Sequence, residues 1–278
     1  MLKLRDGVVE LYKKAATSLP PDVESALRAA YEAEAEGSNA RAAIAQYLEE
    51  TASARAGNVP LCMGSGFPVF LVKAPKGLGQ KELTATLVEA TRIATLKIPL
   101  SQSAVNVITN VNTGDNTGAG FPRIVFEESP NQTLTIELLL ESATSDTMGR
   151  TYALPSTEIG AGADLEGVER CVVHTLKTSG MQACPPYIIG VGIGGSREQV
   201  TALSKLQLRR RLQDKNPDPA LAALEDRTLG AINAITSEGD RKVIALGVKI
   251  GAGHRQPNAY MVDVAISCWA TRRAKLIW

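Results

Sequence analysis

Three of the four cysteines lie where a protein could carry metal ligands. Cys62, Cys184 and Cys268 each occur where a loop meets an apolar, strand-like run, and binding groups are commonly carried at such junctions. Cys62 lies in "NVPLCMGSGFPVF", where the glycines beside it let other atoms approach closely. Cysteine thiolates bind zinc and iron–sulfur clusters. Burial in the core is the alternative for each one, because free cysteine is among the most buried residue types.

The spacing of the cysteines disfavours a disulfide framework or a local metal motif. They are few and far apart, and no Cys-x-x-Cys pair occurs, although zinc ribbons and ferredoxin-type clusters are built on such pairs. A site shared by Cys62, Cys184 and Cys268 must therefore be assembled by the fold. Cys171 differs from these three because it lies in the middle of a predicted helix beside two valines. We expect it to be a core residue.

Two polar segments could contact a substrate. His254 lies in the loop "GAGHRQPNAY" and could act as a general acid or contact an anion, with a solvated loop residue as the equal alternative. The segment "NVNTGDNTGAGFPR" contains Asn112 and Asn116, whose amides could orient a carboxylate. Asn side chains also bond their own backbone in turns, which explains such segments without a ligand.

The segment "YIIGVGIGGS" is an apolar run that ends in glycines, and we predict a buried strand followed by a tight turn. The glycines could hold an anion at the start of the next helix, but Gly190, Gly192, Gly194 and Gly195 do not fit the G-x-G-x-x-G dinucleotide pattern. We favour a tight turn from strand to helix, since glycine is the usual residue in such turns.

Hydrophobic periodicity predicts an α+β (mixed α/β) fold, with a helical N-terminal region followed by irregular mixed sheets and packed helices. We expect one domain over residues 1–278, with residues 1–57 as a helical segment. Helices are predicted at 6–17, 19–37, 38–57, 79–97, 163–180, 196–212 and 219–235. Strands are predicted at 67–75, 123–129, 132–142, 187–193, 242–250 and 259–270, those at 123–129 and 132–142 as a hairpin, with a loop at 143–162.

Composition and charge argue against several classes of protein. The 278 residues are 44% hydrophobic and carry 30 basic and 29 acidic residues, for a net charge of +1. This balance gives no electrostatic reason to expect nucleic-acid or membrane binding. No apolar run is long enough to span a bilayer, and the charged N-terminus lacks the apolar centre of a signal peptide. We therefore expect a cytoplasmic protein.

Taken together, these features resemble the alpha subunit, or N-terminal domain, of the class I fumarase and tartrate dehydratase family of iron–sulfur hydro-lyases. The resemblance covers most of the chain. Its motifs are "LPPDVESALRAAYEAE", "VPLC" before a glycine turn, "NTGDNTGAGFP", "CPPYIIGVGIGGS", "LSKLQLRRRL", "DPALAALEDRTLGAINAI" and "GHRQPNAYMVDVAISCWATRRA".

The resemblance implies a cofactor and partners. It implies that Cys62, Cys184 and Cys268 hold a [4Fe–4S] cluster whose open iron acts as a Lewis acid on a small hydroxy- or unsaturated carboxylic acid. It also implies a beta-type subunit or second domain on a separate chain, and an oligomer. By the same comparison Lys97, Asn112 and Asn116 are candidates for substrate binding, and His254 is the candidate catalytic residue.

The sequence also departs from the family pattern. Met63 and Gly64 stand where the family has a glutamine and a catalytic aspartate, and Gln256 stands at the second histidine of a His-x-His pair. Lys97 takes the place of an arginine that grips the substrate carboxylate. Losing a general acid–base typically costs about 10²–10⁴-fold in rate. Two other functions are therefore open: sulfur or other group transfer at the open iron, and a non-catalytic structural subunit.

Overall fold

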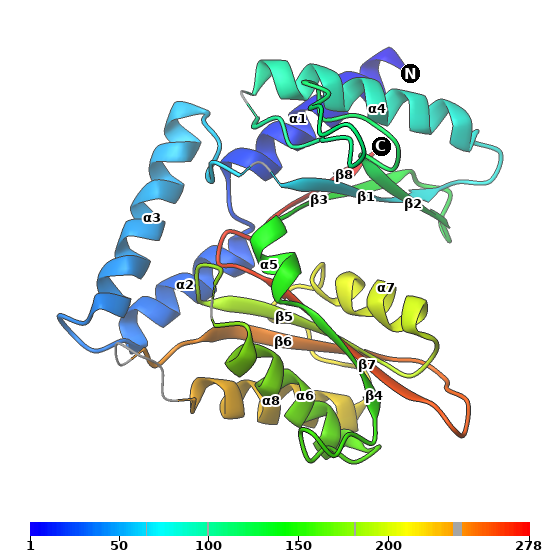
Figure 1. The fold of residues 1–278 in the computed structure, drawn as a ribbon. Coiled ribbons are helices and arrows are strands. Elements are labelled where there is room, and N and C mark those ends of the chain that lie inside the picture. Colours follow the sequence, from blue (N-terminus) through cyan, green and yellow to red (C-terminus); the bar gives the residue numbers. More distant parts are fainter. Residues whose placement is uncertain (65, 99, 181, 236–240) are drawn as a thin grey trace. The chain divides into compact units, whose positions relative to one another are not determined.

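The computed structural model describes residues 1–64, 66–98, 100–180, 182–235 and 241–278 (Figure 1). Their contacts divide the chain into two compact units, and neither is continuous in sequence. Unit 1 comprises residues 1–20, 49–143 and 270–278, and unit 2 comprises residues 21–48 and 144–269. We predicted one domain over residues 1–278, and we describe each unit by itself. The mixed α+β fold class is confirmed.

Unit 1 contains a four-stranded sheet with helices packed on it. The strand order is β2 (Arg123–Glu128), β1 (Phe67–Ala74), β3 (Thr135–Glu141) and β8 (Arg272–Ile277). Helices α1 (Leu2–Thr17) and α4 (Gln80–Lys97) pack together and bury their apolar faces in one core with the sheet (Figure 1). The core is almost entirely aliphatic, apart from Tyr12 and Phe70, whose rings meet edge to face.

The predicted hairpin between residues 123–129 and 132–142 is wrong. Both segments are strands, but each pairs with β1 and neither pairs with the other: β2 runs parallel to β1 and β3 runs antiparallel to it. The physical reason is burial. Strand β1 is buried along most of its length, whereas β2 is mostly exposed or half-buried. The more apolar strand therefore takes the central position, and β2 becomes the edge.

Unit 2 contains a second four-stranded sheet covered on both faces. The strand order is β4 (Arg150–Leu154), β7 (Tyr260–Ser267), β5 (Tyr187–Ile193) and β6 (Ala245–Ala252). Helix α7 (Arg197–Gln207) lies on one face, and α6 (Leu165–Thr178) and α8 (Pro219–Asn233) lie on the other (Figure 1). The remaining helices are α2 (Pro21–Ala33), α3 (Asn39–Gly57), which contributes residues to both units, and α5 (Ala143–Met148).

The glycines of β5 explain how α7 can lie so close to the sheet. A Cβ atom on Gly190 would lie 2.2 Å from the Ser204 carbonyl oxygen, and one on Gly192 would lie 2.2 Å from that of Val200. Any larger side chain would push α7 away. Gly194 then turns the chain at φ +100°. The glycine run is thus a close strand-to-helix connection, as we favoured from the sequence.

Two other predictions need correction, and one strand was missed. Residues 143–162, predicted as a loop, contain α5 and the edge strand β4, whose exposed residues show no apolar alternation. The helix predicted to 212 ends at Gln207. Strand β8 was not predicted, because only part of its short alternating pattern is buried. Among the described residues, no helix is both long enough and apolar enough to cross a membrane.

Candidate functional site

Cys184 and Cys268 lie at the same end of unit 2's sheet. Cys184 is three residues before β5, and Cys268 directly follows β7. The two strands are antiparallel, with Ile188 opposite Ser267, so the start of one meets the end of the other. The backbone N–H of Trp269 donates to the Cys184 carbonyl at 3.4 Å. The fold therefore brings together two cysteines that are far apart in the sequence.

Aromatic residues hold the segments around these two cysteines. Trp269 is buried and its ring stacks on Tyr47, with centroids 4.2 Å apart. The Tyr187 hydroxyl donates to the Ala183 carbonyl at 2.7 Å, which fixes the turn next to Cys184. Burial raises the pKa of the Tyr187 phenol, and Cys184 and Cys268 raise it further. Cys184 is exposed, and Cys268 is 8% exposed.

Cys171 is a core residue, as predicted. It lies on α6 with no exposed surface, and burial raises the pKa of its thiol to about 12. A thiol with such a high pKa stays protonated at neutral pH and is a poor metal ligand, since the thiolate is the binding form. This residue therefore gives a natural comparison for the other three cysteines.

Cys62 is half-buried in the loop that leads into β1 of unit 1. Its neighbours along the chain are held by three hydrogen bonds. The Leu61 N–H donates to the Ala16 carbonyl at 2.8 Å. The Met63 carbonyl accepts from the Ser101 hydroxyl, and the Gly64 carbonyl accepts from Nη1 of Arg272 at 2.6 Å. The backbone on both sides of Cys62 is thus anchored.

Asn116 supports this loop indirectly. It is 3% exposed and adopts a positive φ of 57°. Its Oδ1 accepts from the Ser103 N–H at 2.6 Å, and its Nδ2 donates to the Ser101 carbonyl at 2.9 Å and to Thr95 Oγ1 at 3.2 Å. The carboxamide therefore fixes the segment whose Ser101 hydroxyl bonds to the Cys62 loop.

Asn112 and Lys97 are both exposed. Nδ2 of Asn112 donates to the Gln102 carbonyl at 2.9 Å, and its Oδ1 accepts from the Gly114 N–H at 2.9 Å. Asn112 and Asn116 thus hold neighbouring positions of one segment. Lys97 is the last residue of α4. The fold therefore brings Asn112 and Asn116 to residues 101–103 of unit 1, and in the described part of the chain no hydrogen bond links Lys97 to either asparagine.

His254 lies at the opposite end of β5 and β7 from Cys184 and Cys268. Its carbonyl accepts from the Gly195 N–H at 2.9 Å, beyond the far end of β5. Strand β5 has seven residues, which corresponds to a separation of roughly 20 Å at about 3.3 Å per residue. Within one copy of unit 2, the histidine and these two cysteines do not form one site.

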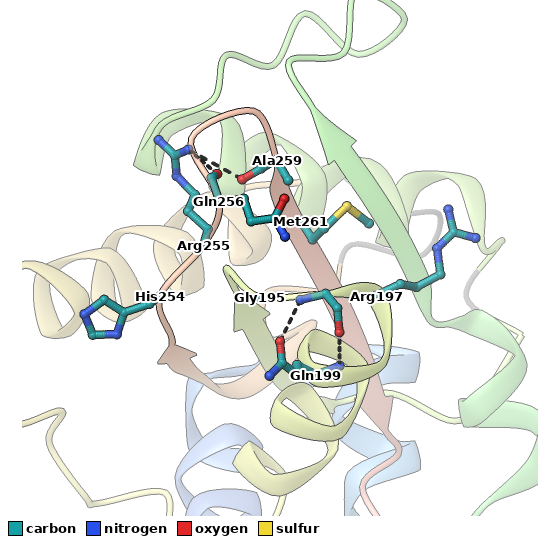
Figure 2. Close-up of a pocket in the computed structure, with 9 residues that line it drawn as sticks. Gly195, Arg197, Gln199, His254, Arg255, Gln256, Ala259 and Met261 are labelled. Atoms are coloured by element: carbon teal, nitrogen blue, oxygen red, sulfur yellow. Dashed lines mark hydrogen bonds between the residues drawn. The ribbon is translucent and has the colours of Figure 1, made fainter.

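His254 instead lines a cavity of about 400 Å³ at the start of α7 (Figure 2). Two arginines, Arg197 and Arg255, belong to this lining together with His254, and Figure 2 shows the three side chains pointing in different directions. Ser196 and Gln199 form a reciprocal capping box that satisfies the backbone N–H groups of these two residues. This region therefore does not focus positive charge on one point.

Comparison with known proteins identifies the family. The family model described as fumarate hydratase (Fumerase) matches residues 5–277. The chain belongs to the fumarate hydratase family.

Curated relatives support this assignment. The chain is 34% identical to a Geobacillus stearothermophilus protein whose name assigns it to class I fumarate hydratases, over 98% of this chain and 54% of that protein. It is 30% identical to a Methanocaldococcus jannaschii protein named for an L(+)-tartrate dehydratase alpha subunit, over 98% and 96% of the two chains. It is 31% identical to the L(+)-tartrate dehydratase alpha subunit of Escherichia coli K12, over 99% and 90%. This chain therefore spans about half of the Geobacillus relative and nearly all of the two alpha subunits.

In this fumarate hydratase-family chain, the predicted cluster ligands come from both units. Cys62 belongs to unit 1, and Cys184 and Cys268 belong to unit 2. Within the part of the chain that the structure describes, no group of three or more His, Cys, Asp or Glu side chains is close enough to hold a metal ion. Cys184 and Cys268 are the two of these predicted ligands that lie at the same end of one sheet.

Two residues that contact the Cys62 loop were missed by sequence reasoning. Ser101 has no motif that distinguishes it from other loop serines. Arg272 lies in a basic run after Cys268, "TRRAK", and such a run is usually a solvated surface. Only the packing of β8 against β3 shows that this arginine is buried.

Proposed function

We propose that this chain is the alpha-type subunit of a [4Fe–4S] hydro-lyase that acts on a small hydroxy- or unsaturated carboxylic acid. The observation that carries the proposal is the contact between Trp269 and Cys184, which joins two candidate ligands in a chain of the fumarate hydratase family. We propose Cys62 as the third ligand from the family resemblance.

The chemistry of the donor set fits a cluster. Cys62 and Cys184 keep exposed surface and lie in loops, unlike the buried Cys171. Three thiolates from a protein leave one iron of a [4Fe–4S] cluster open. When bound, such a cluster would supply a Lewis acid that polarises a carboxylate or hydroxyl oxygen of the substrate. Because free thiols and such clusters persist in reducing compartments, we place the protein in the cytoplasm.

The proposed substrate residues differ in what their geometry allows. Lys97 is an exposed cation that could pair with a substrate carboxylate. Asn112 and Asn116 would act through the segment that they shape, since their amides bond its backbone. His254 lies beyond the far end of β5 from Cys184, so it cannot reach a substrate near Cys184 in the same unit. If His254 acts in catalysis at these cysteines, it must come from another copy, which is consistent with an oligomer.

An exposed apolar tip on unit 1 supports the proposal that a partner chain binds. Residues 105–112 form a small hairpin closed by the bridge between Val105 and Asn112, and its Val107 and Ile108 are 97% and 89% exposed. Exposed apolar side chains gathered at one place commonly mark an interaction site. Because two relatives are named alpha subunits, we propose that a beta-type chain covers this tip.

Anaerobic reconstitution with iron and sulfide tests the cluster. The wild-type chain should bind about four irons, and Cys184→Ser should lose most of them. Cys171→Ser is the matched control, because it removes a thiol that we assign to the core, and it should bind as much iron as the wild type. A wild type without iron, or a Cys184→Ser variant with a full complement, would overturn the proposal.

A further inference from the structure

Arg272 is a buried cation next to the Cys62 loop. It is 1% exposed, the largest side chain in the described residues with so little exposure, and it is the first residue of β8, opposite Leu140 of β3. Burying a guanidinium is costly unless hydrogen bonds compensate for the lost water. A position that retains an arginine under this cost is expected to use it for a specific contact.

The contact is with the backbone of the Cys62 loop. Nη1 of Arg272 donates to the Gly64 carbonyl at 2.6 Å. Gly64 is two residues after Cys62, so their Cα atoms are at most about 7 Å apart. A charged donor makes a stronger hydrogen bond than a neutral one. The guanidinium therefore restrains the backbone close to the thiol.

Gly66 allows the loop to pass over the guanidinium. Its φ is +86°, and a Cβ atom at this position would lie 2.7 Å from the Glu141 carbonyl oxygen and 3.0 Å from Nη2 of Arg272. Any side chain here would displace either strand β3 or the arginine. Gly66 therefore allows the Cys62 loop and the guanidinium of Arg272 to approach each other. This close approach explains why a glycine is needed in the turn after Cys62.

Ser101 restrains the neighbouring carbonyl. Its hydroxyl donates to the Met63 carbonyl, and its own carbonyl accepts from Asn116. The Cys62 loop is therefore held at two consecutive carbonyls, by Ser101 at position 63 and by Arg272 at position 64. Of these two contacts, only the one from Arg272 brings a permanent charge.

We propose that Arg272 is a positioning residue that fixes the Cys62 loop and thereby keeps the Cys62 thiolate bound to its cluster. The cluster part of this inference rests on the proposed function, whereas the restraint on the loop does not. The restraint should slow the reaction of the Cys62 thiol with reagents that can reach it only when the loop opens. It should also slow release of iron from the loaded protein.

The restraint can be measured in the apo-protein by the rate of alkylation with iodoacetamide, followed for each cysteine by peptide mass spectrometry. Arg272→Met keeps most of the volume and removes the charge and donors. It should raise the rate at Cys62 several-fold and leave the slow rate at the buried Cys171 unchanged. Arg272→Lys keeps the charge and one donor group, and it should give an intermediate rate.

Lys275→Met is the matched control. Lys275 lies on the same strand but is exposed, in an ion pair with Glu137 at 3.3 Å. This variant should alkylate like the wild type. A role of Arg272 in overall stability alone would also raise the rate at the buried Cys171, which reacts only when the chain opens. If Arg272→Met does not fold, the alkylation rates of Arg272→Lys and Gly66→Ala test the proposal instead. Both variants should react faster at Cys62 than the wild type. Wild-type rates at Cys62 in the folded variants overturn the proposal.

The rate at which reconstituted protein releases iron to a chelator tests whether Arg272 helps to keep the cluster bound. Arg272→Met should lose iron several-fold faster than the wild type, Arg272→Lys should recover part of the difference, and Lys275→Met should match the wild type. Equal release from all four proteins would overturn the link to the cluster. If the wild type binds no iron but the alkylation result holds, the proposed function fails while the restraint on the loop stands.

Discussion

The carbonyl oxygen of Cys184 accepts a hydrogen bond from the backbone N–H of Trp269, the residue that follows Cys268, at 3.4 Å. This bond joins the start of β5 to the end of β7 and brings two candidate ligands to one end of a sheet. The proposal that Cys184 and Cys268 bind one cluster begins with this contact. The residues that support it can therefore be tested first.

Trp269→Ala should destabilise unit 2 and weaken iron binding. The side chain is buried and stacks on Tyr47, and truncating a buried aromatic residue typically costs about 3–5 kcal/mol in the free energy of unfolding. Urea unfolding and iron analysis of the reconstituted protein measure the two effects. Trp278→Ala is the control, because that residue is 53% exposed and belongs to unit 1, so its loss should change the stability of unit 2 and iron binding little. Full iron retention in Trp269→Ala would show that the stack does not support the cysteines.

Asn116→Ala should destabilise unit 1 more than Asn112→Ala. Asn116 is buried and its carboxamide makes three hydrogen bonds, and an unsatisfied buried group costs about 1–3 kcal/mol. Asn112 is exposed, so water can replace its bonds. Denaturant unfolding of both variants tests this order.

Asn116→Gly separates the side chain from the backbone, since glycine accepts the positive φ without strain. It should be more stable than Asn116→Ala and less stable than the wild type. Equal stability of the glycine variant and the wild type would mean that the carboxamide contributes nothing.

Stability should fall at alkaline pH, in part through Tyr12. Burial raises the pKa of its phenol above the ordinary value of 10.0, while its hydrogen bond to Thr91 opposes this shift. The folded state therefore holds this proton more tightly than the unfolded state does. The stabilisation is complete below pH 10 and is lost as the pH rises above 10, where the unfolded phenol ionises first.

Tyr12→Phe removes this titrating group, so its free energy of unfolding should fall less steeply above pH 10 than that of the wild type. Denaturant unfolding at several pH values measures the two slopes. Tyr31→Phe is the comparison, because Tyr31 is only partly buried. Parallel curves for the wild type and Tyr12→Phe would contradict the prediction.

The double change of Val107→Ser and Ile108→Ser should weaken association with a beta-type chain and leave folding intact. Both side chains are almost fully exposed, and surface substitutions usually change stability by less than about 0.5 kcal/mol. Co-expression with a candidate beta-type chain, followed by co-purification and sedimentation, measures the loss. Leu2→Ser, which changes another exposed apolar residue of unit 1, should leave association unchanged. Wild-type association of the double variant would exclude this tip as the interface.

The sequence by itself determined the family, the fold class and the position of most elements. The helices after residues 20 and 79 carry clear periodicity, and the apolar run at β5 lies between a Cys-Pro-Pro segment and a glycine turn. Cys171 is predicted as a core residue because it lies in the middle of a predicted helix beside two valines. These are local properties, and hydrophobic period and turn chemistry report them directly.

Only the tertiary structure decided which strands pair and which residues meet. The position of β1 between β2 and β3 depends on its burial relative to β2, which segment patterns do not compare. The separation of His254 from Cys184 depends on the direction of β5 and β7. The contact of Arg272 with Gly64 joins residues from distant parts of the chain. Such contacts arise from long-range packing, and the spacing of residues along a chain carries no signal for them.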